Sequence, residues 1–159
     1  MTLAAEIITL CTERRQTVTC AESCTGGMIA AALTDIPGSS AAFERGFVTY
    51  SNAAKMDILG VSPASLDAFG AVSEAVVEEM ASGALKSAKA DFAIAVSGIA
   101  GPGGSEHKPE GRVCFALATP QAVFSQTRDF GALGRDAVRS AARDHALQLT
   151  REALELGSG

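Results

Sequence analysis

The sequence predicts an α/β domain, a three-layer α/β/α sandwich with a mixed, mostly parallel sheet. Segments with strand and helix periodicity alternate along most of the 159 residues, a pattern typical of a sheet covered by helices on both sides. Residues 92–96 are apolar throughout, as expected of a strand buried on both faces. Residues 113–118 and 122–130 are close enough to form a hairpin, which would place one antiparallel strand among parallel ones. We expect one domain over residues 1–156, with residues 157–159 as a flexible tail.

Local signals place the remaining elements. An amphipathic helix opens the chain and ends near residue 15, and a strand follows over residues 17–21. A helix of small residues is expected over 27–34, and a strand over 43–50, in which Gly46 marks a bulge or a close approach. Serine caps predict three further helices, and the last helix carries apolar residues on two faces, which indicates burial in a subunit interface as well as in the core. The caps are Ser51, Ser62 and Ser73, and the last helix spans residues 135–156, with Val138, Ala142, His145, Leu149 and Leu156 on one face and Leu147 and Leu154 on the other.

Composition excludes several classes of protein. The formal net charge is −5 and no dense Lys/Arg block is present, so we expect no nucleic-acid partner. The chain shows no signal-peptide pattern and no apolar run of membrane-spanning length, so we expect no membrane partner. The four cysteines form no C-x-x-C pair, which indicates reduced thiols and a cytoplasmic location. Because there are only two histidines, a His-rich metal site is excluded, and we expect no metal or cofactor.

The turn between the first strand and the following helix holds the first candidate for chemistry, Ser23. A hydroxyl at such a place could be a helix cap, a phosphate ligand or a nucleophile. Thr25 could cap the helix instead, and Gly26 and Gly27 would let a ligand approach backbone N–H groups closely. These residues alone do not decide among the three roles of Ser23.

Two neighbours of Ser23 offer alternatives. Cys24 could be the nucleophile, because a thiol at a helix N-terminus has a lowered pKa, although a free cysteine is more often a small buried hydrophobe. Glu22 could be a general base, an orienting carboxylate or a cap for backbone amides.

A serine nucleophile needs a base, and Lys55 is the leading candidate. A desolvated lysine with a lowered pKa can accept a proton. If the strand before Tyr50 neighbours the first strand, Tyr50 and Lys55 arrive at the same sheet edge as Ser23; otherwise Lys55 is a solvated helix lysine. His145 is more typical of a core histidine, and His107, in a polar loop, is a weaker alternative base.

The loop over residues 97–105 is rich in glycine. Its amides, around Gly98 and Gly101, could form an anion nest or an oxyanion hole, or the segment could be a flexible surface loop. Arg135 and Arg139, one turn apart, could add positive charge to a phosphate site or pair with nearby aspartates on the last helix.

Five segments, taken together and in order, resemble one family: Ala-Glu-Ser-Cys-Thr-Gly-Gly (21–27), Pro-Gly-Ser-Ser (37–40), Gly-Phe-Val-Thr-Tyr-Ser-Asn (46–52, with Lys55), Gly-Ala-Val-Ser-Glu (70–74) and Ser-Gly-Ile-Ala-Gly-Pro (97–102). The sequence is similar to the C-terminal domain of the CinA (competence/damage-inducible) proteins, whose stand-alone members include nicotinamide-nucleotide amidohydrolases. Larger CinA proteins carry an additional N-terminal domain, and we expect the stand-alone form here.

This resemblance implies hydrolysis of the carboxamide of nicotinamide mononucleotide (NMN) to nicotinic acid mononucleotide and ammonia, in pyridine nucleotide recycling. It implies Ser23 as nucleophile, Tyr50 and Lys55 in the catalytic group, and no metal. We expect a homo-oligomer. The alternatives are a non-catalytic nucleotide- or partner-binding domain of the same fold and an amidase that uses Cys24. The substrate-binding residues are expected to be Thr25, Gly26, Gly27, Gly98, Gly101, Arg135 and Arg139.

The sequence departs from the family pattern in two segments expected to hold the substrate. The glycine-rich loop is one residue shorter than usual, and it ends Lys-Pro-Glu-Gly at Glu110, where Lys-Pro-Val-Gly is usual. The last helix is preceded by Leu-Gly-Arg at Gly134, where Gly-Asp-Arg is usual. Both departures leave Ser23, Tyr50 and Lys55 in place.

Overall fold

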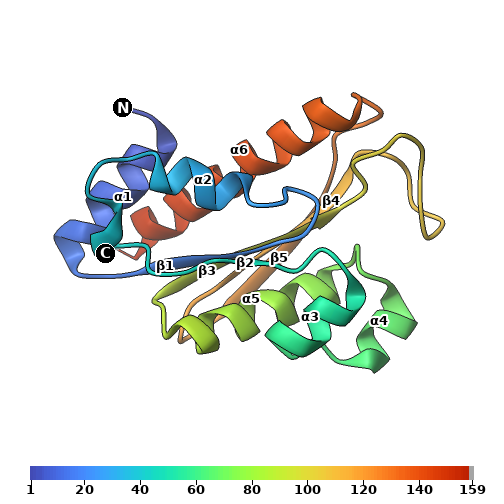
Figure 1. Cartoon of the computed structure of the whole chain (residues 1–159), viewed down its shortest axis with the longest axis horizontal. Coiled ribbons are helices and arrows are strands. Elements are labelled where there is room, and N and C mark those ends of the chain that lie inside the picture. Colours follow the sequence, from blue (N-terminus) through green and yellow to red (C-terminus); the bar gives the residue numbers. More distant parts are fainter. Residues whose placement is uncertain (158–159) are drawn as a thin grey trace.

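A five-stranded sheet forms the middle layer of the molecule (Figure 1). The computed structural model describes residues 1–157, and its strands are β1 (Val18–Glu22), β2 (Phe47–Val48), β3 (Phe92–Gly98), β4 (Arg112–Ala118) and β5 (Val123–Asp129). They lie in the order β2-β1-β3-β4-β5. β1 pairs in parallel with β2 and β3, whereas β4 pairs antiparallel with β3 and β5. Four of these strands therefore point the same way and β4 runs against them, which confirms the predicted mixed, mostly parallel sheet.

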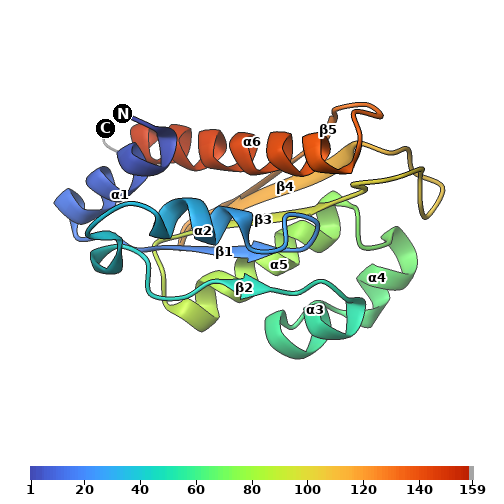
Figure 2. The same ribbon diagram turned by 45° about the horizontal axis from the view of Figure 1, so that its top comes forward.

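Helices cover both faces of this sheet (Figures 1 and 2). One face carries α1 (Leu3–Arg14), α2 (Met28–Thr34) and α6 (Arg135–Leu156), and the other carries α3 (Asn52–Leu59), α4 (Pro63–Phe69) and α5 (Glu74–Ala88). A short 3₁₀ helix, η1 (Ser39–Ala41), lies between α2 and β2. Within residues 1–157, no helix is both long and apolar enough to cross a membrane. Of the tail predicted at residues 157–159, Gly157 follows α6, and residues 158–159 lie outside the described residues.

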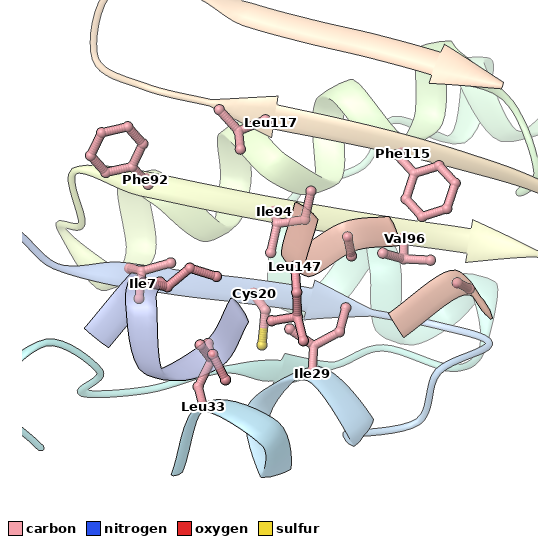
Figure 3. Packing of buried hydrophobic residues seen from close by; sticks show 14 of the residues in the cluster. Ile7, Cys20, Ile29, Leu33, Phe92, Ile94, Val96, Phe115, Leu117 and Leu147 are labelled. Carbon is pink, nitrogen blue, oxygen red and sulfur yellow. The ribbon is translucent and has the colours of Figure 1, made fainter. Parts of the chain in front are cut away.

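The two faces of the sheet differ in the size of their side chains. Alternation along each strand places large apolar residues beneath α1, α2 and α6 (Figure 3) and small ones beneath α5. The large residues fill the space between the sheet and α1, α2 and α6, whereas the small ones let α5 approach the strands closely. The large set is Val18, Phe92, Ile94, Val96, Val113, Phe115 and Leu117, and the small set is Ala21, Ala93, Ala95, Cys114, Ala116 and Ala118.

Serine caps begin three of the helices, as predicted. The hydroxyls of Ser51, Ser62 and Ser73 accept hydrogen bonds from backbone N–H groups in the first turns of α3, α4 and α5. Pro63 occupies the first position of α4, where its missing N–H costs no helical hydrogen bond. The cap at Ser51 marks where α3 starts, and Lys55 therefore lies in the first turn of that helix.

The strand predicted over residues 43–50 is wrong in length, because only Phe47–Val48 forms β2. The reason is the close approach at Gly46. A Cβ at Gly46 would lie 2.9 Å from Cys20 Sγ and 3.0 Å from the Phe43 ring, so the chain before β2 packs against β1 instead of extending the ladder. Gly46 therefore marks a close approach of the chain, which is one of the two interpretations that the sequence left open.

The two apolar faces of α6 have an explanation within the chain. Val138 and Ala142 pack in the core above the sheet, and Leu147 and Leu154 are buried in the same core cluster as α1. Arg14 Nη1 donates a 2.6 Å hydrogen bond to the Leu154 carbonyl, which fixes α1 beside the C-terminal half of α6. The expectation that the second face lies in a subunit interface is therefore wrong for Leu147 and Leu154, because α1 covers them.

Candidate active site

The C-terminal ends of the parallel strands meet at one edge of the sheet and surround a cavity of about 340 Å³. β1 leads into Ser23, β2 leads into Tyr50 and α3, and β3 leads into the glycine-rich loop. α6 begins after β5 at the same edge, with Arg135 as its first residue. Six of the predicted site residues line this cavity: Ser23, Tyr50, Lys55, Gly98, Gly101 and Arg135. The cavity lies within the size range of small-molecule sites.

The turn that carries Ser23 is anchored on both sides. The Ser23 N–H donates to the Val96 carbonyl at 3.0 Å, which ties the turn to β3. Alternation along β1 directs the Glu22 side chain toward α2, where its carboxylate accepts hydrogen bonds from the N–H groups of Ile29 (2.9 Å) and Ala30 (3.0 Å). Glu22 therefore caps backbone amides of α2, which is one of the three roles left open for it. Ser23 does not cap this helix.

Ser23 and Lys55 are in direct contact. The Lys55 Nζ lies 3.0 Å from Ser23 Oγ, and Nζ also donates to the carbonyls of Thr49 (2.9 Å) and Tyr50 (3.3 Å). Lys55 is only 1% exposed and Ser23 8% exposed. The alternative of a solvated helix lysine is therefore wrong for Lys55.

The surroundings of Lys55 shift its equilibrium toward the neutral form. Burial lowers the pKa of the Lys55 ammonium, and the nearby Cys24 and Glu106 oppose this shift. The side chain contacts carbonyl oxygens, which accept N–H hydrogen bonds but carry no full charge. A neutral amine can accept a proton from a hydroxyl at hydrogen-bond distance, so Ser23 and Lys55 have the geometry of a nucleophile and its base.

Tyr50 contacts Lys55 through its backbone, and its phenol points elsewhere. The Tyr50 hydroxyl accepts a 2.8 Å hydrogen bond from Arg135 Nη2, and Arg135 Nη1 donates to the Gly101 carbonyl at 2.7 Å. The side chain of Tyr50 is 59% exposed. Arg135 therefore joins the segment after β2 to the glycine-rich loop, and it is a fixed positive charge on the cavity wall.

The expected low pKa of Cys24 is wrong. Cys24 is 4% exposed, and burial raises the pKa of its thiol to about 11. Arg139 and Lys55 lower that pKa by smaller amounts and do not offset burial. At neutral pH only on the order of one thiol in ten thousand would be ionised, so Cys24 is a poor nucleophile in this state.

Four predicted binding residues do not line the cavity. Thr25 is fully buried, and Gly26 and Gly27 belong to the turn before α2, with positive φ values of 55° and 107°. Arg139 Nε donates a 2.9 Å hydrogen bond to the Cys24 carbonyl. Thr25, Gly26 and Gly27 therefore form part of the turn outside the cavity lining, and Arg139 contacts that turn from α6.

The glycine-rich loop forms part of the cavity lining and contains backbone N–H groups without a partner in the described residues. Ala100 and Gly101 line the cavity, and neither of their N–H groups donates a hydrogen bond within the described part of the chain. Backbone N–H groups without partners can stabilise an oxyanion or a phosphate. The loop is thus part of the cavity wall, and the alternative of an uninvolved surface loop does not hold for it.

Neither histidine meets Ser23. His145 packs edge-on against Phe115 and Phe130, and its ring nitrogens contact Arg128 and Gln126. It is half-buried beside β5, at the margin of the core and not inside it. His107 is exposed in the loop after Ser105 and does not line the cavity.

Sequence reasoning missed two features of the site. The carbonyl of Thr49 holds Lys55, and a backbone acceptor leaves no signal in residue type. Glu110, noted only as a departure from a pattern, hydrogen-bonds to the glycine-rich loop. Glu110 stands next to Gly111, whose N–H donates to the Ile99 carbonyl, and a carboxylate beside such a glycine is the signal that could have indicated it. The residues that Glu110 contacts, however, depend on the fold.

Comparison with known proteins identifies the family. The sequence model of the CinA C-terminal domain matches residues 1–154. The chain belongs to the CinA C-terminal domain family. Over 136 residues it is 59% identical to "Nicotinamide-nucleotide amidohydrolase PncC" of Escherichia coli (strain K12), a match that covers 85% of this chain and 82% of that protein. It is 51% identical over 154 residues to the "CinA-like protein" of Shewanella sp. (strain ANA-3), covering 96% of this chain but only 36% of that longer protein.

Solved structures of CinA proteins share this fold. The competence/damage inducible protein CihA from Agrobacterium tumefaciens superposes with a TM-score of 0.92 at 49% identity, covering 96% of this chain and 93% of that one. The competence damage-inducible protein A (ComA) from Klebsiella pneumoniae gives a TM-score of 0.93 at 42% identity, covering 96% and 95%. The expected CinA resemblance and α/β fold are both confirmed.

Proposed function

We propose that this chain hydrolyses the carboxamide of NMN to nicotinic acid mononucleotide and ammonia. The observation that carries the proposal is the 3.0 Å contact between Ser23 Oγ and the buried Lys55 Nζ, on the wall of a cavity that Arg135 also lines. The 59% identity to a protein named nicotinamide-nucleotide amidohydrolase supports the substrate. The chain is thus proposed to be a hydrolase with a serine nucleophile.

The first half of the reaction forms an acyl-enzyme. Lys55 Nζ takes the proton of the Ser23 hydroxyl while Oγ bonds to the carboxamide carbon, and the carbonyl electron pair moves to oxygen. The free amides of Ala100 and Gly101 are available to this oxyanion. The carbon–nitrogen bond then breaks, and the proton held on Lys55 passes to the leaving nitrogen, which departs as ammonia.

The second half releases the acid. Water attacks the ester carbon and gives a proton to Lys55, and the bond to Ser23 Oγ breaks. Lys55 returns that proton to Ser23, so both groups end as they began. The carboxyl product ionises to the carboxylate of nicotinic acid mononucleotide.

Substrate binding is proposed to involve two groups of residues. Arg135, with the loop around Gly98 and Gly101, would hold the phosphate by charge and by backbone N–H donors. Thr25, Gly26, Gly27 and Arg139 would contribute by fixing the turn that carries Ser23, because Arg139 donates to the Cys24 carbonyl behind it.

Incubation with NMN tests the proposal. Ammonia and nicotinic acid mononucleotide should form in equal amounts, Ser23→Ala should lower the rate by about a thousandfold or more, and Cys24→Ala should retain turnover. Binding of NMN without ammonia release would instead support the non-catalytic binding domain. Loss of turnover in Cys24→Ala with retention in Ser23→Ala would support a thiol nucleophile.

We further propose a single-domain, cytoplasmic homo-oligomer without a nucleic-acid partner. The net charge of −5 argues against binding to nucleic acid, and the cysteines of residues 1–157 are all free thiols, as in a reducing compartment. The edge strand β5 exposes Val123 and Phe124, an apolar surface beside an unpaired strand edge. Sedimentation of the purified chain at the monomer mass would contradict the oligomer.

A further inference from the structure

Glu110 links two segments that both border the cavity. Its Oε1 accepts a 2.7 Å hydrogen bond from the Gly103 N–H, in the glycine-rich loop. Its Oε2 accepts a 3.3 Å hydrogen bond from the Gly134 N–H, immediately before Arg135. One carboxylate thus bridges the loop after β3 and the start of α6, and we call this bridge the Glu110 clasp.

The loop has room for this clasp because of Gly101. A Cβ at Gly101 would lie 2.5 Å from the Glu110 Cδ, and Gly101 has a φ of 93°, which favours glycine. The Gly101 carbonyl accepts a hydrogen bond from Arg135. The loop is therefore held twice to the start of α6, by the Glu110 carboxylate at one amide and by the Arg135 guanidinium at one carbonyl.

The clasp also brings a carboxylate to the start of α6. Gly134 offers no side chain to the first turn of α6, and no side-chain hydrogen bond caps that helix from its own N-cap. The carboxylate of Glu110 reaches the same place from another segment, where negative charge is favourable to a helix N-terminus. Glu110 therefore supplies the side-chain contact that the N-cap residue of α6 lacks.

We propose that Glu110 is a positioning residue that sets the selectivity of the site for a phosphorylated substrate. The proposal rests on the proposed function. By fixing the loop to the start of α6, the clasp holds the loop amides and the Arg135 guanidinium at one distance from each other before substrate arrives. Donors placed in advance bind an anion without a further ordering cost.

The clasp acts on binding of the phosphate and not on the reacting groups. Ser23 and Lys55 hold each other through a separate contact and are supported by β1, β2 and α3. A substrate that lacks the phosphate, such as nicotinamide riboside, has no group for the clasped donors to bind. The effect of Glu110 should therefore depend on the phosphate.

The test compares NMN with nicotinamide riboside in the wild type and in Glu110→Gln. A glutamine has one acceptor oxygen, so it can satisfy one of the two N–H groups and turns an NH₂ group toward the other. We expect KM for NMN to rise about tenfold with kcat within threefold, and the riboside kcat/KM to stay within threefold. Glu13→Gln, at an exposed carboxylate of α1, is the control and should leave kcat and KM unchanged for both substrates.

An unchanged ratio of kcat/KM between the two substrates in Glu110→Gln would overturn the proposal, whether both values are retained or both fall equally. Hydrogen exchange provides a readout that needs no activity. Residues 100–105 and 131–135 should exchange faster in Glu110→Gln while α1 and β1 stay as protected as in the wild type. If the wild type fails to release ammonia from NMN, the proposed function fails, and unchanged exchange in the variant would separately contradict the clasp.

Discussion

Lys55 Nζ faces three oxygen atoms, and this arrangement explains how a lysine could act as a base. A neutral amine has two N–H groups and one lone pair. The carbonyls of Thr49 and Tyr50 can take the two N–H groups, which leaves the lone pair for the Ser23 hydroxyl. Because burial lowers the pKa of the ammonium, the folded chain shifts Lys55 toward the neutral form that this chemistry needs.

Replacement of Lys55 by Met should show whether it is the base. We expect kcat/KM for NMN to rise with pH as the lowered pKa of Lys55 is passed, because only the neutral amine accepts the Ser23 proton. Lys55→Met should reduce kcat by about a hundredfold or more and remove this rising limb. Rates measured across neutral and alkaline pH, with the exposed Lys86→Met as control, would test this; an active Lys55→Met with the same limb would contradict it.

The sequence could indicate Ser23 and Lys55 as partners but not their contact. Ser23 stands out on a turn between a strand and a helix, and the cap at Ser51 places Lys55 in the first turn of α3. Their meeting depends on parallel pairing of β2 with β1, which involves only two residue pairs. The Glu110 clasp depends on residues 103, 110 and 134 converging, and no local pattern encodes such an approach.

At the scale of elements, α5 depends on the absence of a side chain at Gly83. An ideal Cβ at this position would overlap the carbonyl oxygen of Leu59, at the end of α3. Glycine within a helix ordinarily weakens it by about 0.5–1 kcal/mol relative to alanine. At Gly83 we expect alanine to be the less stable residue, because its Cβ would overlap a backbone atom of α3 that cannot easily move aside.

Gly83→Ala should therefore destabilise the protein despite the higher helix propensity of alanine. We expect the free energy of unfolding to fall by about 1–3 kcal/mol, as for overpacked core sites. Ser87→Ala, at an exposed position of the same helix, should be neutral or slightly stabilising. Urea unfolding of both variants measures this difference, and a Gly83→Ala variant more stable than the wild type would show that α3 moves away at little cost.

Elements with local signals could be predicted well, and those set by packing could not. The caps of α3, α4 and α5 are properties of short segments, and the structure has them as predicted. The length of β2 depends on how closely the chain at Gly46 approaches Cys20, which is a property of the assembled core. Alternation in the sequence around residues 43–50 therefore indicated a longer strand than the ladder supports.

At the scale of the whole molecule, the first and last helices pack together. Ile7 and Ile8 of α1 share a core cluster with Leu147 and Leu154 of α6. An ion pair between Arg151 and Glu6, at 3.1 Å, lies at the border of this contact. Periodicity alone showed two apolar faces on α6, but it could not tell a neighbouring helix from a neighbouring subunit.

A pair of leucines on α6 tests this packing. Leu154 is fully buried, whereas Leu156 is 84% exposed, so the same Leu→Ala change removes core packing in one case and little in the other. We expect Leu154→Ala to lower the free energy of unfolding by about 2–5 kcal/mol and Leu156→Ala to change it by less than about 0.5 kcal/mol. Chemical denaturation of both variants distinguishes them, and equal effects would contradict the assignment of Leu154 to the contact with α1.

The pairing of α1 with α6 also sets an order of events on the ribosome. Ser23 and Lys55 emerge early, but Arg135 and the helix that covers Ile7 and Ile8 emerge more than half a chain later. A nascent chain therefore holds the proposed reacting groups before it has a complete core or Arg135, the cation proposed to bind the phosphate. Resistance to proteases and affinity for a nucleotide should accordingly arise together, once α6 has left the exit tunnel and closed over α1.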